Sequence, residues 1–375
     1  MKPAPIHSSD ASTMDTSIAT NKLVNRLVYN GRFTSQKTTG VQRVARELVA
    51  ALVKLQGSEV TLAVPPQDGL DPVQGVQTVQ LGFGKGVFWE QIVLPLFAGR
   101  SRIVNLSNSG SIFRPNQIIY MHDAAVFDTP AHFSWKFRTW YHVMFWILAR
   151  TSSCVMTNSK FSRDRLAHHV GVPAERIGVV PLAADHLDHI APDTTVIDEL
   201  GLAKRRYVLA VSSMNPTKNF KRLVEAFMRL NDPSTDLVIV GMKNAAIFGK
   251  AHDLSSAPNI KQAGYVSDEK LKALYQHAAC FLYPSIYEGF GIPPLEAMRN
   301  GCPTLVGRAG ALPETCGDAS IYCDPFSVED ISNKLRQLLD SPELSEDLKR
   351  RGLSHAERFR WTESARLLMQ FIDKP

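Results

Sequence analysis

The sequence has little cysteine and no long apolar run. Its five cysteines are odd in number and form no C-x-x-C pair, which argues against a disulfide framework or a zinc site. No stretch reaches about 18 uninterrupted apolar residues, so no segment is expected to span a membrane. Residues 1–22 are rich in Ser, Thr, Ala and Asp and lack the apolar core of a signal peptide. These absences predict a cytoplasmic protein with a disordered tail at residues 1–22.

Several motifs for cofactors and partners are also missing. No G-x-G-x-x-G follows the first predicted strand, which argues against a dinucleotide-dependent oxidoreductase. No D-x-D motif stands in a context suited to a metal ion, and no nucleic-acid-binding motif is present. The formal net charge of +6 and the pI near 9.0 indicate a mild attraction to anions. Nucleotides and phospholipid head groups are the anions that we expect the protein to meet.

Short apolar runs alternate with helical patterns along the chain, which predicts βαβ units and parallel sheets. The candidate strands are residues 26–30, 60–64, 103–106, 118–121, 154–157, 177–180, 207–212, 237–240, 280–283, 303–306 and 320–323. Residues 184–200 are acidic and poor in large apolar side chains, so we place the domain boundary near residue 190. We expect one domain over residues 23–190, a second over 191–355, and a C-terminal helix within 356–375 that includes the amphipathic segment Trp361–Ile372.

The most informative segment is residues 283–298, YPSIYEGFGIPPLEAM. Gly289 and Gly291 allow the backbone to approach a ligand closely. Pro293 and Pro294 suit the first turn of a helix, because an N–H group there has no partner within the helix. The free N–H groups and the dipole at such a helix start favour a phosphate. The segment therefore predicts a phosphate-binding loop followed by a helix.

Glu288 and Glu296 stand eight positions apart in this segment, one in the loop and one in the expected first helical turn. Alone, they would be a solvated loop acid and a residue that interacts with the helix dipole. Within the intact run EGFGIPPLEAM, the pair resembles the E-x7-E signature of retaining GT-B glycosyltransferases of family GT4. The resemblance implies that Glu288 lies near the hydroxyls of the donor sugar and that Glu296 binds the ribose. The residues between them are then expected to contact the donor: Gly289, Phe290, Gly291 and Ile292.

A glycine also stands at the start of the first predicted helix. Gly40 follows the strand at residues 26–30 and its loop, where helical N–H groups could meet a diphosphate or where the chain simply turns. The segment is similar to the glycine-containing N-terminal loop of GT4 enzymes. That similarity places Gly40 and Arg43 beside the donor phosphates.

His122 and Asp123 directly follow a strand that is predicted to be buried. Residues at the carboxyl ends of parallel strands face ligand clefts. His122 is therefore either a catalytic residue or a structural histidine bonded to the backbone. The GT4 family has a histidine at the corresponding point, near the donor sugar and the acceptor, and the resemblance favours the catalytic role. Asp123 would orient His122 or cap the next turn.

Lys218 and Asn219 follow the first strand of the second half. GT4 enzymes often have an Arg and a Lys here, and Lys218 with Asn219 matches the second member of that pair. The Arg is absent, and its candidate places hold uncharged residues: Ser212, Ser213, Asn215 and Thr217. The resemblance implies that Lys218 meets the diphosphate and acts in catalysis, unless it is one of the surface lysines. A hydroxyl in place of the Arg would bind phosphate more weakly.

Two further segments resemble the family. At Tyr265 and Val266 the family's backbone contacts the nucleotide base, which does not identify the base. In the stretch after the next strand, Gly310 and Glu314 have either a structural or a functional role. Residues 132–150 are aromatic and basic. They form either a surface that lies on an anionic membrane or a core helix of the first domain.

Together these motifs imply a GT-B fold, with two Rossmann-like domains facing a central cleft. The implied activity is transfer of a hexose from a nucleotide-diphosphate sugar with retention of configuration and without a cofactor or metal ion. The wording of the segment favours GDP-mannose, while UDP-glucose, UDP-N-acetylglucosamine and dTDP-rhamnose stay open. The expected acceptor is a saccharide or a polyprenyl-linked saccharide, with no nucleic acid as partner. A nucleotide-sugar-binding protein without transfer activity is the main alternative.

Overall fold

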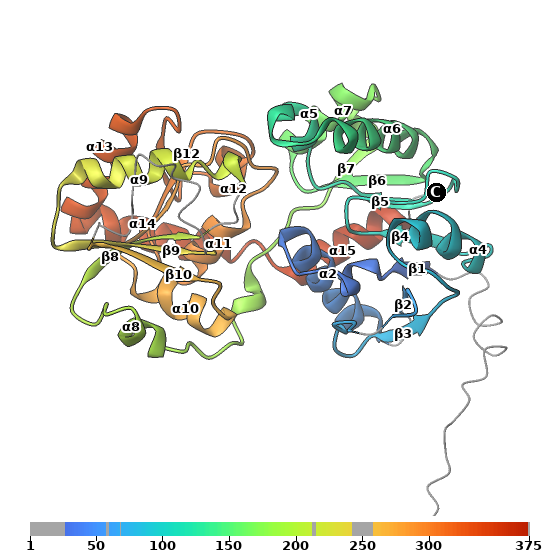
Figure 1. Ribbon diagram of the computed structural model, residues 1–375, viewed down its shortest axis with the longest axis horizontal. Helices are drawn as coiled ribbons and strands as arrows, with labels where there is room; N and C mark the ends of the chain where they lie inside the picture. The colour runs from blue at the N-terminus through green and yellow to red at the C-terminus, as the bar shows by residue number, and fades with distance from the viewer. Residues whose placement is uncertain (1–26, 58–59, 68, 212–214, 242–257, 374–375) are drawn as a thin grey trace, which may run out of the picture.

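The computed structural model describes two α/β domains that lie side by side (Figure 1). The description covers residues 27–57, 60–67, 69–211, 215–241 and 258–373. The expected disordered tail at residues 1–22 lies outside the described residues. Within them, no helix is long and apolar enough to cross a membrane. None of the five cysteines, all of which lie within the described residues, forms a disulfide bond, as their spacing predicts.

The first domain is built on a seven-stranded parallel sheet with the order β3-β2-β1-β4-β5-β6-β7. Its strands are β1 Leu27–Asn30, β2 Thr61–Val64, β3 Gln77–Gln80, β4 Arg102–Asn105, β5 Ile118–Tyr120, β6 Cys154–Thr157 and β7 Ile177–Val179. Its helices are η1 Arg32–Ser35, α2 Gly40–Gln56, α3 Gly86–Phe88, η3 Trp89–Val93, α4 Leu94–Phe97, α5 Ala125–Asp128, η4 Pro130–His132, α6 Trp135–Thr151, α7 Lys160–Val170 and η5 Ala174–Arg176.

Successive side chains of each strand point to opposite faces of this sheet, and the two faces pack against different helices. Tyr29 and Tyr120 point into a core shared with α2 and the C-terminal helix α15 (Trp361–Ile372). Val28 points to η3 and α4 on the opposite face, and Ile119 points to α6 and α7 on that same face. The C-terminal helix therefore completes the first domain by packing against α2, although it follows the second domain in sequence (Figure 1).

The second domain has a six-stranded parallel sheet with the order β10-β9-β8-β11-β12-β13. Its strands are β8 Arg206–Val211, β9 Thr235–Val240, β10 Ile260–Gly264, β11 Cys280–Tyr283, β12 Thr304–Gly307 and β13 Ile321–Cys323. Its helices are η7 Pro216–Lys218, α9 Phe220–Leu230, α10 Asp268–His277, α11 Ile292–Arg299, α12 Leu312–Cys316, α13 Val328–Asp340 and α14 Pro342–Ala356.

The connection between the sheets runs through η6 (Asp185–Leu187) and α8 (Thr195–Glu199). The predicted parallel α/β architecture is confirmed, since every paired strand is parallel to its neighbours. The apolar runs predict neither β3 nor β10. Both are edge strands with polar, partly exposed residues, so neither carries the continuous apolar pattern of a buried strand.

Candidate active site

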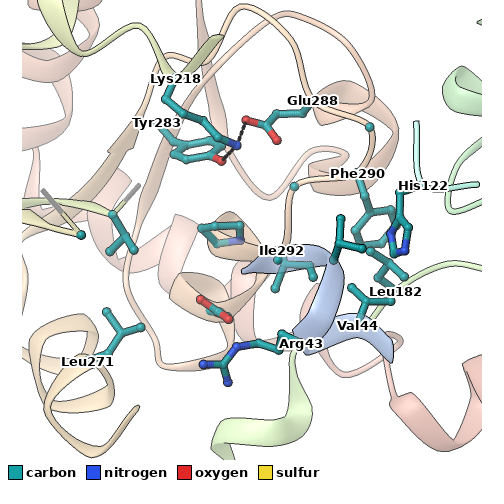
Figure 2. A pocket seen from close by; sticks show the side chains of 18 of the residues that line it. Arg43, Val44, His122, Leu182, Lys218, Leu271, Tyr283, Glu288, Phe290 and Ile292 are labelled. Atoms are coloured by element: carbon teal, nitrogen blue, oxygen red, sulfur yellow. Dashed lines mark hydrogen bonds and ion pairs between the residues drawn. The ribbon is translucent and has the colours of Figure 1, made fainter. Parts of the chain in front are cut away.

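A cavity of about 400 Å³ lies between the two domains. Figure 2 shows Lys218, Tyr283 and Glu288 on one side of it and His122, Leu182 and Val44 on another. Every residue predicted from the sequence for catalysis or donor binding lines this cavity except Asn219. These residues are Gly40, Arg43, His122, Lys218, Tyr265, Val266, Glu288, Gly289, Phe290, Gly291, Ile292 and Glu296. The fold thus gathers them from both domains.

The loop and helix of residues 283–298 have the predicted form. Gly291 takes a left-handed backbone conformation (φ 106°) directly before α11, which begins at Ile292. The two prolines occupy the next two positions, where a missing N–H costs no helical hydrogen bond. Glu296 is the fifth helical residue, so it lies in the second turn and not in the first turn that the sequence predicts. Gly291, Ile292 and Pro293 at this helix start line the cavity.

Gly289 shows how closely the two domains approach. A Cβ atom at this position would lie 2.6 Å from the Cβ of Asp123, in the other domain. The carbonyl oxygen of Gly289 accepts hydrogen bonds from Ser159 Oγ at 2.6 Å and Ser162 Oγ at 2.9 Å. Glycine is therefore required here by contact between the domains.

Glu314 also joins the two domains. Its carboxylate oxygens accept hydrogen bonds from the backbone N–H groups of Lys160 at 2.8 Å and Phe161 at 3.0 Å, in the first turn of α7. A Cβ at Gly310 would lie 2.5 Å from the carbonyl oxygen of Glu288. Both residues thus have a structural role: Glu314 joins the two domains, and Gly310 packs against the loop at Glu288.

Lys218 and Glu288 form an ion pair on the cavity wall (Figure 2). Lys218 Nζ donates to Glu288 Oε1 at 2.7 Å and to Tyr283 Oη at 2.8 Å. Ser285 Oγ donates to the same glutamate oxygen at 2.6 Å. Both charged side chains are mostly buried, with exposed fractions of 19% and 10%. A cation for phosphate and an acceptor for hydroxyl groups thus stand next to each other.

Glu296 is held from two sides. Tyr275 Oη donates to its Oε2 at 3.0 Å, and His186 Nε2 lies 3.1 Å from its Oε1. Burial raises the pKa of this carboxyl, but His186, Arg43 and Tyr275 together outweigh that effect, and the pKa lies below its ordinary value. Glu296 is therefore a fixed carboxylate on the cavity wall.

His122 fits both roles considered from the sequence. Its ring Nε2 donates to the carbonyl oxygen of Leu106 at 2.9 Å, so the lone pair is on Nδ1. Burial lowers the pKa of His122 to about 4, and the ring is therefore neutral near pH 7. His122 also lines the cavity. Asp123 accepts a hydrogen bond from the Ala125 backbone at 2.9 Å and so caps the next turn.

Gly40 and Arg43 occupy the start of α2 at the cavity. No atom lies within 4 Å of the position that a Cβ on Gly40 would take, so this helix start faces open space. Arg43 makes two bonds across the cleft to Asp268, with N–O distances of 2.7 and 2.8 Å. The resemblance implies that Arg43 contacts the donor phosphates. In this structure its guanidinium is paired with a carboxylate of the second domain.

Asn219 lies away from the cavity. It has a left-handed backbone (φ 60°) and is buried before α9. Its amide donates to the carbonyl oxygens of Pro284 at 2.9 Å and Pro325 at 2.6 Å. In this structure Asn219 therefore joins two loops under the site. Of the residues at the missing Arg, Thr217 is buried, while Ser212 and Ser213 lie outside the described residues.

Tyr265 and Val266 also line the cavity. The ring of Tyr265 is 62% exposed, and the Nζ atom of Lys37 from the first domain lies 4.7 Å from its centroid. An exposed aromatic ring between two domains offers a surface on which a planar base can stack.

The sequence does not single out five residues that belong to this site: Asn158, His186, Asp268, Tyr275 and Tyr283. Asn158 directly follows strand β6, and His122 lies two residues after the end of β5, so the rule that residues after parallel strands face ligand clefts could have found Asn158. Its Oδ1 atom is buried and makes no hydrogen bond to the described residues. His186 and Tyr275 have no local signal, because they reach the site through Glu296 from elements distant in sequence.

Comparisons with known proteins agree with this geometry. Residues 38–186 match the family described as Glycosyltransferase Family 4, and residues 194–355 match Glycosyl transferases group 1. The chain is 34% identical over 221 residues to O-antigen chain mannosyltransferase B of Escherichia coli, an alignment that covers 56% of this chain and 58% of that protein. The chain thus spans less than two thirds of the length of this relative.

Solved structures show the same fold. Sucrose-phosphate synthase from Thermosynechococcus elongatus superposes with a TM-score of 0.76 at 18% identity, covering 93% of this chain and 98% of that one. HepE of Anabaena, in complex with UDP and glucose, superposes with a TM-score of 0.73 at 17% identity, covering 94% and 100%. The predicted GT-B fold is confirmed by these likenesses and by the two facing parallel sheets. The chain belongs to the GT4 family of GT-B glycosyltransferases, whose second domain is the group 1 glycosyl transferase domain.

Proposed function

We propose that the protein is a retaining glycosyltransferase that moves a hexose from a nucleotide-diphosphate sugar to a saccharide or lipid-linked saccharide in bacterial surface polysaccharide synthesis. One observation carries the proposal: Lys218 and Glu288 lie 2.7 Å apart on a cavity wall that also contains Glu296 and the start of α11. This wall offers a cation and helical N–H groups for a diphosphate and two carboxylates for hydroxyl groups.

The proposed chemistry follows from charge. The bond between the anomeric carbon and the diphosphate oxygen breaks, which leaves negative charge on the diphosphate and positive character on the sugar. Lys218 and the helix starts at Gly40 and Gly291 stabilise the leaving group. The acceptor hydroxyl attacks on the face from which the diphosphate leaves. Its proton passes to a phosphate oxygen, so no separate protein base is required and the configuration is retained.

Two glutamates and a neutral histidine position the substrates. Glu288 accepts hydrogen bonds from the sugar hydroxyls, and Glu296 accepts them from the ribose. Because His122 is neutral, its free Nδ1 can accept a hydrogen bond from the sugar or the acceptor. In this scheme Lys218 and the helix dipoles supply the positive charge without a metal ion. Activity that persists in excess chelator is therefore expected.

The favoured donor is GDP-mannose. Mannosyltransferases of O-antigen chains are among the relatives, while HepE was solved with UDP and glucose. UDP-glucose, UDP-N-acetylglucosamine and dTDP-rhamnose are the competing donors. Thermal unfolding with GDP, UDP, ADP and dTDP discriminates the bases, because a ligand at a hundred times its dissociation constant stabilises by about 2.7 kcal/mol. We expect the largest shift with GDP, and a larger shift with UDP or dTDP would replace GDP-mannose as donor.

The alternative is a protein that binds nucleotide sugars without transferring them. Release of nucleoside diphosphate from the donor that gives the largest thermal shift separates the two functions. Slow release in water, accelerated by an added saccharide acceptor, supports transfer. Binding without release under either condition would leave only the binding function.

We also propose that the outer face of the first domain lies on a membrane surface. Of the seventeen large apolar side chains that are exposed in the described part of the chain, eleven lie on or beside α3, η3, α4 and α6, which cover one face of the sheet. This aromatic face consists of Phe83, Val87, Phe88, Ile92, Leu96, Phe97, Phe113, Trp135, Phe137, Val143 and Trp146. Helix α6 therefore fits both interpretations of residues 132–150, since its other side is buried in the core.

The charge around the aromatic face fits an anionic bilayer. The segments 83–114 and 132–151 contain seven Lys and Arg residues and a single acidic residue, Glu90, which is buried. Exposed aromatic side chains with flanking cations are typical of surfaces that lie on anionic lipid. Such a position would bring the cavity close to an acceptor anchored in the membrane.

Vesicle sedimentation tests this surface. We expect binding to vesicles that contain phosphatidylglycerol, weaker binding to pure phosphatidylcholine, and loss of binding when Trp135 and Trp146 are both replaced by Ser. The control is Phe326→Ser, an exposed aromatic residue of the second domain. Equal vesicle binding by the double variant would contradict the proposal. If the wild type is a dimer in the absence of lipid and the double variant is a monomer, the aromatic face would be assigned to contact with a second copy, which would also contradict the proposal.

A further inference from the structure

His186 lies in the connection between the two domains, on the short helix η6. Its side chain is 4% exposed, and its Nε2 atom is 3.1 Å from Glu296 Oε1. This is an ion-pair distance and not a hydrogen bond of regular geometry, and Nε2 makes no hydrogen bond to any described residue. The group within ion-pair distance of this buried nitrogen is therefore the Glu296 carboxylate.

The other side of the ring fixes which nitrogen carries hydrogen. Trp361 Nε1 donates to His186 Nδ1 at 3.5 Å. Since an indole N–H can only donate, Nδ1 accepts, and the hydrogen of the neutral imidazole lies on Nε2, the nitrogen that is 3.1 Å from Glu296 Oε1. The backbone N–H of Trp361 also donates to Asp185 Oδ1 at 2.9 Å. The C-terminal helix α15 therefore holds η6 and orients the histidine.

Glu296 keeps room for a ligand. His186 faces Oε1 and Tyr275 Oη bonds Oε2, and a carboxylate has about four acceptor positions. Roughly half of these remain for groups in the cavity, which Glu296 lines. Arg43 and Asp268 line the same cavity and are paired with each other across the cleft. The residue that orients and charges Glu296 on its buried side is therefore His186.

We propose that His186 is a positioning residue that fixes the Glu296 carboxylate for the ribose hydroxyls of the donor and so sets the preference for ribonucleotides over deoxyribonucleotides. The inference rests on the proposed function, which assigns the ribose to Glu296. Without the histidine, the buried carboxyl would keep Tyr275 as a partner but lose the group beside its Oε1, and it would turn away or take up a proton. The ribose contact then depends on the two segments in which the chain passes from one domain to the other, η6 and the start of α15.

Binding of paired nucleotides tests the inference. Calorimetry with GDP and 2′-deoxy-GDP, and with UDP and 2′-deoxy-UDP, measures the ribose preference of the intact protein. We expect the wild type to favour the ribonucleotide and His186→Ala to reduce that preference by about tenfold, the share of a hydrogen bond to a charged group. In turnover, the KM for the donor sugar should rise by a similar factor while kcat changes by less than about threefold.

Two conservative variants distinguish positioning from a structural role. In His186→Gln the side-chain amide can still donate to Glu296, so much of the preference should return. In Trp361→Phe the indole donor is lost and the preference should fall only in part. His189→Gln, at an exposed histidine in the same connection, is the control and should behave as the wild type. If His186→Ala does not fold, His186→Gln and Trp361→Phe still carry the test.

The outcomes also separate this inference from the proposed function. If Glu296→Gln retains the full ribose preference, the assignment of the ribose to Glu296 fails, and the inference with it. If Glu296→Gln abolishes the preference while His186→Ala keeps it, the inference alone is overturned. An equal loss of affinity for ribonucleotide and deoxyribonucleotide in His186→Ala, or a loss confined to kcat, would also overturn it.

Discussion

The two walls of the cavity are built in different ways. On the second-domain wall one continuous segment, residues 283–298, supplies a loop, a helix start and both glutamates. On the first-domain wall Gly40, His122 and Asn158 come from three separate elements. A wall made from one segment is visible in the sequence, whereas a wall made from separate elements is complete only in the folded protein.

The walls also differ in how their polar groups are satisfied. In the second domain Lys218 and Glu288 are bonded to each other and to neighbouring hydroxyls. In the first domain the space beside Gly40 is open, and Asn158 Oδ1 has no hydrogen bond within the described residues. We therefore expect changes to the bonded pair Lys218 and Glu288 to affect the chemical step and changes beside Gly40 to affect nucleotide affinity.

The largest effect is expected from Lys218→Ala. Removing a fixed donor at a developing charge costs roughly 2.7–4 kcal/mol of transition-state stabilisation, so turnover should fall by about a hundredfold or more. Lys221→Ala, at an exposed lysine in the first turn of the following helix α9, is the matched control. Donor turnover at saturation is the measurement. Near-normal turnover of the Lys218 variant would remove this lysine from the mechanism.

A pair of glycine variants tests the contrast between the walls. In Gly289→Ala the new Cβ would press on Asp123 across the domain contact, and we expect a loss of about 1–3 kcal/mol of stability. In Gly40→Ala the new methyl group meets no protein atom, so stability should hold. It would, however, occupy space beside the helix start and weaken nucleotide binding. Thermal unfolding and nucleotide titration give the two readouts.

The opposite pattern in this pair would count against the structure of both walls. A stable Gly289→Ala protein would mean that the domains do not approach as closely as described. Unchanged nucleotide binding by Gly40→Ala would separate the start of α2 from the donor site.

The bond between Arg43 and Asp268 is expected to give the smallest effect. Both side chains are 30% exposed, so the pair contributes no more than about 1 kcal/mol to domain contact. If Arg43 also meets the donor phosphates, Arg43→Ala should lower donor affinity more than Asp268→Asn does. Equal losses in the two variants, with coupling in the double variant, would limit Arg43 to joining the domains.

Much of the fold and of one wall could be predicted from the sequence. The buried strands have continuous apolar runs, and the helix start of α11 has glycine and proline at fixed positions. The edge strands β3 and β10 lack such runs because only part of each is covered. The contacts of Arg43 with Asp268 and of His186 with Glu296 could not be predicted. They join residues far apart in sequence and exist only once the domains have met.

The central claim is that this cavity transfers a sugar with retention of configuration. Proton NMR of the reaction with GDP-mannose and a saccharide acceptor tests it directly, because the anomeric signals of donor and product are resolved. The account predicts an α-linked product from the α-linked donor in the wild type, and at least a hundredfold slower formation in Lys218→Ala. A β-linked product, or no transfer from any of the four candidate donors, would contradict it.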